Sequence, residues 1–240
     1  MAVAMAFGSC ALIGSAHAYQ AGSVVDGGSI RGTVRFDGTP PPSKKLPINK
    51  DNEVCGPGPF EHKEVDVGAN GALKGVVVYL EKVEKGKVWP SASYLLDQTK
   101  CAFTPALQVV RNGASLTIRN SDPVLHNVHP YEIVGKSRRT LFNLAQPTQG
   151  QTNTMKIDAK RGRAIELSCD AHNWMSGWVY VVDNPYYALV GADGKFEIGG
   201  VPPGEYKVMA WHPTLGTVSQ TVKVAAKGAA DAAFAFKPGS

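Results

Sequence analysis

Three side chains that bind soft or borderline metal ions lie within a span of seven residues, at Cys169, His172 and Met175. A thiolate and a thioether are soft ligands, and an imidazole binds several borderline metals. This set suits a copper ion better than the other metals common in proteins. Glycine and apolar residues follow at 177–182, which is typical of a buried strand, so the loop should lead into a rigid element.

A mononuclear copper site with one thiolate and one thioether needs a second imidazole. Beyond residue 18 the chain offers His62, His126, His129 and His212 in addition to His172. We favour His126, because it follows a turn after a predicted strand and lies far enough upstream for sheet pairing to bring it to the loop. His129 lies three residues further on, and in an extended segment it should point to the opposite face.

The loop also fits three other interpretations. A buried cysteine beside a core histidine and a core methionine is common, since both sulfur residues pack as apolar side chains. Zinc is the second, but a thioether is a poor zinc ligand and this stretch holds a single cysteine. A nucleophilic Cys–His pair is the third, although two intervening residues make direct activation awkward and nothing nearby indicates a substrate.

The elements around the loop are predicted to be strands. Apolar residues alternate at 30–36 and 115–119, among other runs, and residues 76–80 form a continuous apolar run typical of a strand covered on both faces. Glycine and proline separate these runs, and no segment shows a sustained helical period, so we predict an all-β chain. Residues 43–73 are expected to be irregular. Residues 136–154 are expected to form a loop with a solvated cluster of basic residues, Lys136, Arg138 and Arg139.

Composition narrows the function and the compartment. A net charge of +5, spread along the chain, gives no signature of nucleic-acid binding, and no apolar run long enough to span a membrane follows the N-terminal segment. Residues 1–18 are small and apolar and end in an Ala-His-Ala cleavage pattern, which predicts a secretory signal and a periplasmic or extracellular protein. Export permits disulfides. Three cysteines then remain, and if Cys169 binds metal, Cys55 and Cys101 are the candidates for a disulfide.

Several of these motifs together resemble a cupredoxin of the plastocyanin and amicyanin type. The resemblance covers residues 93–183 and rests on Phe103-Thr104-Pro105, Leu116-Thr117-Ile118, Asn120, His126-Asn127 and Cys169-x-x-His172-x-x-Met175 followed by Gly177. It implies a Greek-key β-sandwich that holds one type 1 copper ion on His126, Cys169, His172 and Met175. It also implies that Asn127 ties the two ligand loops together. Trp174 departs from the family pattern, and we expect it to flank His172 at an exposed edge for electron transfer.

The flanking segments resemble a second family, the carboxypeptidase-regulatory-like β-sandwich of the transthyretin type. The similarity lies in the opening strand at 32–38, the turn at 192–196 and the hairpin at 201–206. We therefore predict a split sandwich, residues 28–88 plus 184–240, with the copper domain at 93–183 inserted in it or packed on it. Two tandem units divided near Asp183 are the simpler alternative.

These expectations combine into an exported blue-copper protein that transfers electrons and is not an enzyme. An oxidase or nitrite reductase would need further clustered histidines for a second copper, and the spare histidines lie far apart in the sequence. The expected partner is a redox protein, such as a c-type cytochrome or another copper protein. Two alternatives remain open: a non-redox copper carrier or sensor, and a structural cell-surface module that copper staples together.

Overall fold

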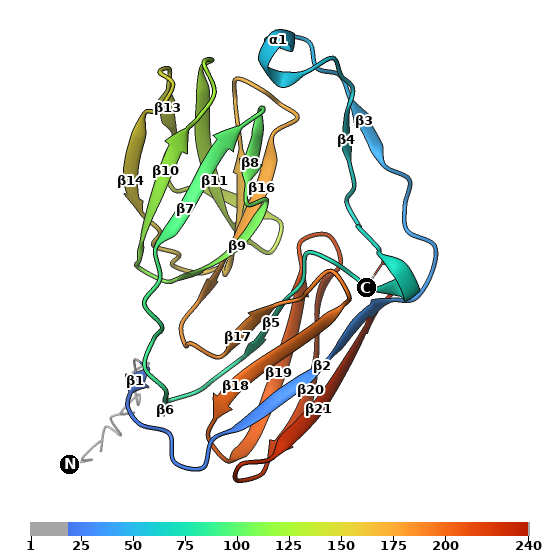
Figure 1. The fold of residues 1–240 in the computed structure, drawn as a ribbon, viewed down its shortest axis with the longest axis vertical. Coiled ribbons are helices and arrows are strands. Elements are labelled where there is room, and N and C mark those ends of the chain that lie inside the picture. The colour runs from blue at the N-terminus through green and yellow to red at the C-terminus, as the bar shows by residue number, and fades with distance from the viewer. Residues whose placement is uncertain (1–18, 240) are drawn as a thin grey trace, which may run out of the picture.

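A computed structural model describes residues 19–239 of the chain. These residues form 21 strands, one short α-helix (α1, Asn52–Cys55) and one 3-10 helix (η1, Ala69–Gly71). The predicted all-β class is confirmed. The strands build two β-sandwiches, and an extended arm connects them (Figure 1). The predicted signal at 1–18 lies outside the described residues, and no helix within 19–239 is long and apolar enough to cross a membrane.

The first sandwich contains the predicted ligand residues. One of its sheets has the strand order β14 (Thr152–Lys156), β10 (Ser115–Asn120), β7 (Tyr94–Thr99) and β8 (Ala102–Thr104). The other has the order β12 (Ser137–Thr140), β11 (His126–Val134), β15 (Ala164–Ser168), β16 (Ser176–Val182) and β9 (Leu107–Arg111), and β13 (Leu144–Gln146) pairs with β11. The alternation predicted for 115–119 buries Leu116 and Ile118 completely in the core between the sheets.

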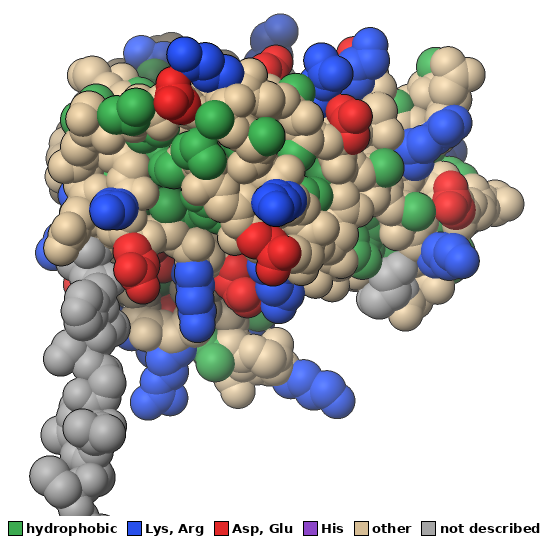
Figure 2. All heavy atoms as spheres, turned by 90° about the horizontal axis from the view of Figure 1, so that it is seen from below, with side chains coloured by type: hydrophobic (Ala, Val, Ile, Leu, Met, Phe, Trp, Pro, Cys, Tyr) green, Lys and Arg blue, Asp and Glu red, His purple; other side chains and the backbone are tan. Residues whose placement is uncertain are grey.

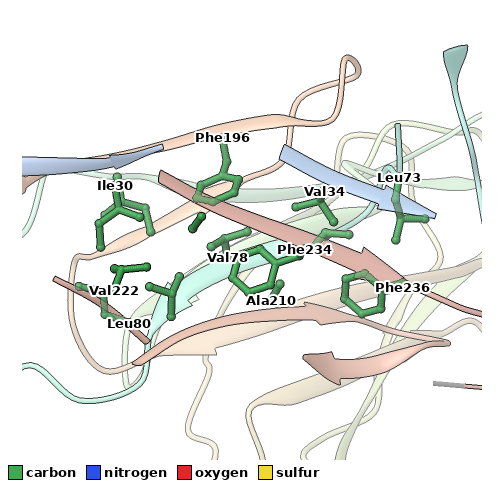
Figure 3. Packing of buried hydrophobic residues seen from close by; sticks show 14 of the residues in the cluster. Ile30, Val34, Leu73, Val78, Leu80, Phe196, Ala210, Val222, Phe234 and Phe236 are labelled. Carbon is green, nitrogen blue, oxygen red and sulfur yellow. The ribbon is translucent and has the colours of Figure 1, made fainter. Parts of the chain in front are cut away.

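The second sandwich takes strands from both ends of the chain. One of its sheets has the strand order β17 (Tyr187–Leu189), β5 (Val77–Leu80), β19 (Gly204–His212) and β20 (Gly216–Val224). The other has the order β18 (Lys195–Val201), β2 (Gly28–Phe36) and β21 (Ala229–Phe236). Figure 3 shows side chains from the two sheets, among them Val78 and Phe234, meeting in its core. The chain therefore leaves this sandwich after β5 and returns to it at β17. A short parallel pair, β1 (Gln20–Ala21) and β6 (Lys85–Gly86), lies beside the crossing point.

Strand β5 is covered on both faces, as its continuous apolar run predicted. Val78 and Leu80 point into the core of the second sandwich, whereas Val77 and Tyr79 belong to an apolar cluster that the two sandwiches share. Tyr79 meets Tyr180 of β16 with ring centroids 5.2 Å apart, and Tyr180 meets Trp211 of β19 at 4.5 Å. Buried aromatic side chains thus make up much of the contact between the sandwiches.

The segment 136–154 is not the loop that we expected. It contains β12, β13 and β14, and the basic residues of β12 form ion pairs across the sheet. Arg138 contacts Glu166 at 3.2 Å, and Arg139 contacts Glu132. These short strands carry few apolar residues, which hid them from a periodicity argument. Elsewhere too, basic side chains are interspersed with acidic ones, as on the face that Figure 2 shows.

Glu132 is a fully buried carboxylate in β11. Its Oε1 accepts hydrogen bonds from the backbone N–H groups of Lys160 (2.8 Å), Arg161 (2.5 Å) and Gly162 (2.7 Å), and its Oε2 accepts one from Arg139 Nε (2.8 Å). Burial alone would raise the pKa of Glu132, but these donors outweigh it and lower the pKa to about 2. The carboxylate thus fixes the turn that leads into β15.

Replacing Glu132 by glutamine should destabilise the protein at neutral pH. A folded pKa of about 2 against an ordinary value of 4.5 corresponds to about 3 kcal/mol. Because the folded pKa is depressed, this stabilisation is present above pH 4.5 and is lost as the pH falls toward 2. In chemical denaturation, the free energy of unfolding of Glu132→Gln should therefore lie below that of the wild type at neutral pH, and this gap should close in acid. Glu166→Gln, at a more exposed partner of Arg138, is the control, and a gap that persists unchanged in acid would contradict the assignment.

Residues 44–62 form the arm, which runs from the second sandwich to the far end of the first (Figure 1). Strands β3 (Lys44–Leu46) and β4 (Phe60–His62) pair antiparallel, and α1 lies at the tip. Apolar residues of the arm pack against the core of the first sandwich; they are Leu46, Ile48, Val54 and Phe60. Each strand has only three residues and carries Lys or Glu, so the sequence predicted irregular structure here.

A disulfide fastens the arm to the first sandwich. Cys55, at the end of α1, is joined to Cys101, in the turn between β7 and β8, with an S–S distance of 1.97 Å. The bridge spans 46 residues of sequence, for which the chain-entropy relation gives about 4 kcal/mol of stabilisation. We expect the double variant Cys55→Ser, Cys101→Ser to show a lower Tm by circular dichroism and faster proteolysis within the arm. An unchanged Tm would mean that the packing of the arm alone holds it.

Candidate metal centre

The four predicted ligands lie at one end of the first sandwich, next to the tip of the arm. His126 is the first residue of β11, Cys169 directly follows β15, and Met175 directly precedes β16. Strands β11 and β15 are antiparallel neighbours, so the start of one lies beside the end of the other. His126, Cys169, His172 and Met175 are all at most 2% exposed. The sheet therefore brings together residues that are more than forty positions apart.

Three of the donor atoms converge on one point. His126 Nδ1 lies 2.9 Å from His172 Nδ1, and His172 Nδ1 lies 3.9 Å from Cys169 Sγ. The ligand atoms of these residues all lie within 4.8 Å of one another. This spacing is of the order expected for donors that share one ion, since metal–nitrogen and metal–sulfur bonds are about 2.0–2.3 Å long.

The outer nitrogens of the two imidazoles test whether a metal fits between them. His126 Nε2 lies 2.9 Å from Asp122 Oδ2, and His172 Nε2 lies 2.8 Å from Asp51 Oδ2. A carboxylate only accepts hydrogen bonds, so each Nε2 carries the hydrogen and each Nδ1 is left with a lone pair. Two lone pairs that face each other across 2.9 Å repel unless a cation lies between them, either a proton that the two rings share or a metal ion. A carboxylate on the outer nitrogen is also the usual environment of a metal-binding histidine. The residues fit a metal ion.

Burial sets the protonation of the donors before a metal binds. It raises the pKa of the Cys169 thiol, an effect that the Asn127 N–H, 3.4 Å from Sγ, partly offsets. Burial also lowers the pKa of His172, against the opposing effect of Asp51. A neutral imidazole is ready to bind a metal, whereas the thiol must give up its proton on binding.

Asn127 ties β11 to the loop that follows Cys169. Its Oδ1 accepts hydrogen bonds from the N–H groups of Asp170 (2.6 Å) and Ala171 (3.2 Å), and its Nδ2 donates to Asp170 Oδ2 (3.0 Å). This is the role that the resemblance implied. These hydrogen bonds fix the loop relative to β11, which pre-arranges the donors.

Asp122 connects His126 to the turn that carries the disulfide. Lys100 and Cys101 both adopt positive φ (52° and 54°), a conformation that β-hairpin turns usually reserve for Asn or Gly. Their N–H groups donate to the Asp122 carboxylate, each at 2.8 Å, which compensates for the unfavourable turn. The same carboxylate oxygen that meets Cys101 N also meets His126 Nε2.

The expected electron-transfer edge needs correction. We placed His172 and Trp174 at an exposed edge, but the His172 side chain is 0% exposed and Trp174 is 1% exposed. Their rings pack together with centroids 5.0 Å apart. The physical reason is the arm, whose Asp51 carboxylate lies on the nitrogen that would otherwise face solvent. Asp51 precedes His172 by 121 residues, and no sequence pattern connects them.

Met175, the predicted fourth ligand, is buried beside the ligand loop. It is 1% exposed and belongs to the same core cluster as Cys169, and its N–H donates to His172 O at 3.0 Å. That hydrogen bond closes a tight turn between the two residues. The turn keeps the thioether side chain on the loop that also supplies the thiolate and one imidazole.

The remaining histidines do not join the centre. His129 contacts Asp170 (3.2 Å) and Tyr131 (2.8 Å) on the outer side of the sheet, in keeping with its predicted position on the opposite face. His212 is buried in the second sandwich, where its Nδ1 accepts a hydrogen bond from Thr214 N–H (3.1 Å) and burial lowers its pKa to about 4. These contacts place His212 in the packing of the second sandwich, away from the centre.

No protein-family model matches the sequence, and no curated protein matches it either. Among solved structures, the novel purple cupredoxin from Nitrosopumilus maritimus is 20% identical, and the match covers 38% of this chain and 100% of that one with a TM-score of 0.32. A point mutant of amicyanin in its reduced Cu(I) form is 21% identical over 38% of this chain and 84% of that one, with a TM-score of 0.32. The Cu-containing nitrite reductase from Thermus scotoductus SA-01 is 16% identical over 43% of this chain, with a TM-score of 0.31, and the match covers only 25% of that chain.

Similarities at this level say nothing about the chemistry of the site. The case for a metal centre rests on the chain itself: a buried thiol and two imidazoles converge, and a carboxylate fixes each imidazole with its lone pair directed inward.

Proposed function

We propose that the chain is a mononuclear copper protein that transfers single electrons, with the ion held by His126, Cys169, His172 and Met175. The observation that carries the proposal is the pair of Nδ1 atoms at 2.9 Å, each with its lone pair directed at the other, beside the Cys169 thiol. Two imidazoles, a thiolate and a weak thioether form the donor set of a type 1 copper site. When bound, copper would supply a one-electron redox couple.

The surroundings of the donors favour electron transfer over catalysis. Sulfur ligands stabilise Cu(I) and imidazoles suit both oxidation states, so one fixed geometry serves the whole cycle. Asn127, Asp122 and Asp51 hold that geometry by hydrogen bonds. The donors are buried, which leaves little room for a substrate at the ion. We infer that the protein is not an enzyme.

The proposed partner is a redox protein in the periplasm or outside the cell, such as a c-type cytochrome or another copper protein. Because the arm lies over His172, such a partner would meet α1 and the Asp51 carboxylate rather than a bare imidazole edge. Electrons would then cross one additional hydrogen-bonded layer. A brief encounter with a small contact area suits this kind of exchange.

Visible and electron-paramagnetic-resonance spectra of the copper-loaded chain test the proposal. We expect an intense thiolate-to-copper band at roughly 600 nm, the region expected for this donor set, that a reduced c-type cytochrome bleaches with a one-to-one gain of oxidised cytochrome. His126→Gln should lose the band, whereas His129→Gln, the matched control three residues away, should keep it. A copper-loaded chain without a visible band would contradict the type 1 assignment. A band that no redox partner bleaches would contradict electron transfer.

A further inference from the structure

A second pair of sulfur atoms, those of the disulfide, lies beside the proposed copper ligands. The Sγ atoms of Cys55 and Cys101 and a ring nitrogen of His172 all lie within 4.8 Å of one another. A second group with mutual distances within 4.8 Å consists of Cys101 Sγ, a carboxylate oxygen of Asp122 and a ring nitrogen of His126. The disulfide is therefore next to both imidazoles rather than a remote crosslink.

Two carboxylates hold this arrangement together. Asp122 Oδ2 accepts from Cys101 N–H at 2.8 Å and meets His126 Nε2 at 2.9 Å. On the arm, Cys55 N–H donates to the backbone oxygen of Asp51 at 2.8 Å, and the Asp51 carboxylate meets His172 Nε2. Each cysteine is thus linked through one aspartate to one copper ligand. The disulfide and the two imidazoles therefore share their hydrogen-bonding partners.

We propose that reduction of the Cys55–Cys101 disulfide creates a second metal site, in which the two thiolates and His172 bind Cu(I). Joined by a covalent bond, the two sulfurs are poor ligands, but as thiolates they are among the softest that a protein offers and select Cu(I). Two thiolates and one imidazole around a small ion need separations of about 3.5–4 Å, given bond lengths of about 2.0–2.3 Å. The ring nitrogen already lies within 4.8 Å of both sulfurs, and the sulfurs, 1.97 Å apart in the disulfide, must separate once the bond is reduced.

The chemistry needs a two-electron reductant, for which a thiol–disulfide oxidoreductase is the appropriate class. Its dithiol attacks Cys55, which is half-buried, rather than Cys101, which is 1% exposed. Two electrons and two protons pass to the pair and yield two thiols, while the oxidoreductase leaves as a disulfide. Cu(I) then displaces the two thiol protons, which pass to solvent.

This second site gives the inner site a route for loading. His172 belongs to both groups of donors, so the ion could move inward from Cys55 and Cys101 to His126 and Cys169 without passing through solvent. Reoxidation by a disulfide of the same enzyme class returns two electrons to that enzyme and closes the route behind the ion. The existence of the second site goes beyond the proposed function; only its use for loading depends on it.

Cu(I) titration against a chromophoric Cu(I) chelator tests the second site in the absence of the inner one. The full chain carries Cys169→Ser, which disables the inner site, and Cys10→Ser, which removes the remaining extra thiol. We expect the reduced protein to bind one equivalent of Cu(I) at least roughly 100-fold more tightly than the oxidised protein, because two thiolates become available. X-ray absorption should report two sulfur ligands and one nitrogen ligand. Adding Cys55→Ser and Cys101→Ser should abolish the tight binding.

The role of His172 separates a built site from two loose thiols on an opened arm. Adding His172→Ala should weaken Cu(I) binding roughly tenfold or more and remove the nitrogen ligand, whereas His129→Ala should change neither. Equal Cu(I) affinities of the His172→Ala and His129→Ala variants would overturn the proposal. It would also be overturned if the reduced protein bound Cu(I) no more tightly than the variant that lacks Cys55 and Cys101. The proposed function is judged separately, on the visible band of the wild-type chain with its disulfide intact.

Discussion

Cys169→Ser should remove the visible band of the copper-loaded protein altogether. The band arises from charge transfer between a thiolate and copper, and Cys169 is the free cysteine among residues 19–239. A serine hydroxyl at the same place is a hard, neutral donor that a soft ion binds weakly. We therefore also expect the Cu(I) affinity of the protein with its disulfide intact to fall, by roughly 100-fold or more, because the one anionic ligand is lost.

The chain contains a matched control for this substitution. The double variant Cys55→Ser, Cys101→Ser also exchanges cysteine for serine near the centre, but it leaves the Cys169 thiol in place. It should keep the band while it loses stability. If that variant lost the band and Cys169→Ser kept it, the donor set would have to be reassigned to the disulfide cysteines.

Asp51→Asn should loosen the centre without unfolding the protein. Removing a carboxylate that orients a metal-binding imidazole typically weakens metal binding about 10- to 100-fold, and we expect a loss in this range for copper. The copper reduction potential should rise as well, because a negative charge 2.8 Å from His172 Nε2 no longer stabilises the oxidised ion. Chelator competition and redox titration measure the two effects.

Asparagine is the appropriate replacement because of the backbone at this position. Asp51 has φ of 52° and ψ of 34°, the left-handed conformation that Asp and Asn tolerate far better than other residues with a side chain. Alanine would add backbone strain to the loss of the carboxylate. Asp66→Asn, which breaks an exposed ion pair with Lys74, is the control. Equal copper affinities of wild type and Asp51→Asn would show that the contact with His172 only packs the arm.

The ligand loop could be recognised from the sequence because its information is local. Cys169, His172 and Met175 lie in one short stretch, and the apolar run that follows at 177–182 predicts that this stretch leads directly into a buried strand. Predicting His126 required one more assumption, that two strands pair and bring it to the loop. Its position after a turn that follows a strand was enough to select it. The continuous run at 76–80 likewise predicted a strand covered on both faces.

The surroundings of the centre could not be predicted in the same way. Asp51 meets His172 because an arm with little apolar alternation crosses from one sandwich to the other, and contact across 121 residues leaves no periodic trace. Asp122 was within reach, since it precedes His126 by four residues in a turn, but its dependence on Cys101 was not. The exposure of His172 was therefore misjudged, and its place in the donor set stays a prediction.

The strands of the second sandwich come from two segments of the chain that the first sandwich separates, and this should determine the order of folding. Arg31 and Asp231 form an ion pair across β2 and β21 although 200 residues separate them. Pairing β2 with β21 in the unfolded chain must therefore close a very long loop. The first sandwich uses one continuous stretch and its contacts are more local, so we expect it to form earlier. Once formed, it brings the ends of β5 and β17 together, where Tyr79 pairs with Tyr187, and the effective loop becomes short. We therefore expect the sandwich that carries the candidate metal centre to act as the template on which the other sandwich assembles.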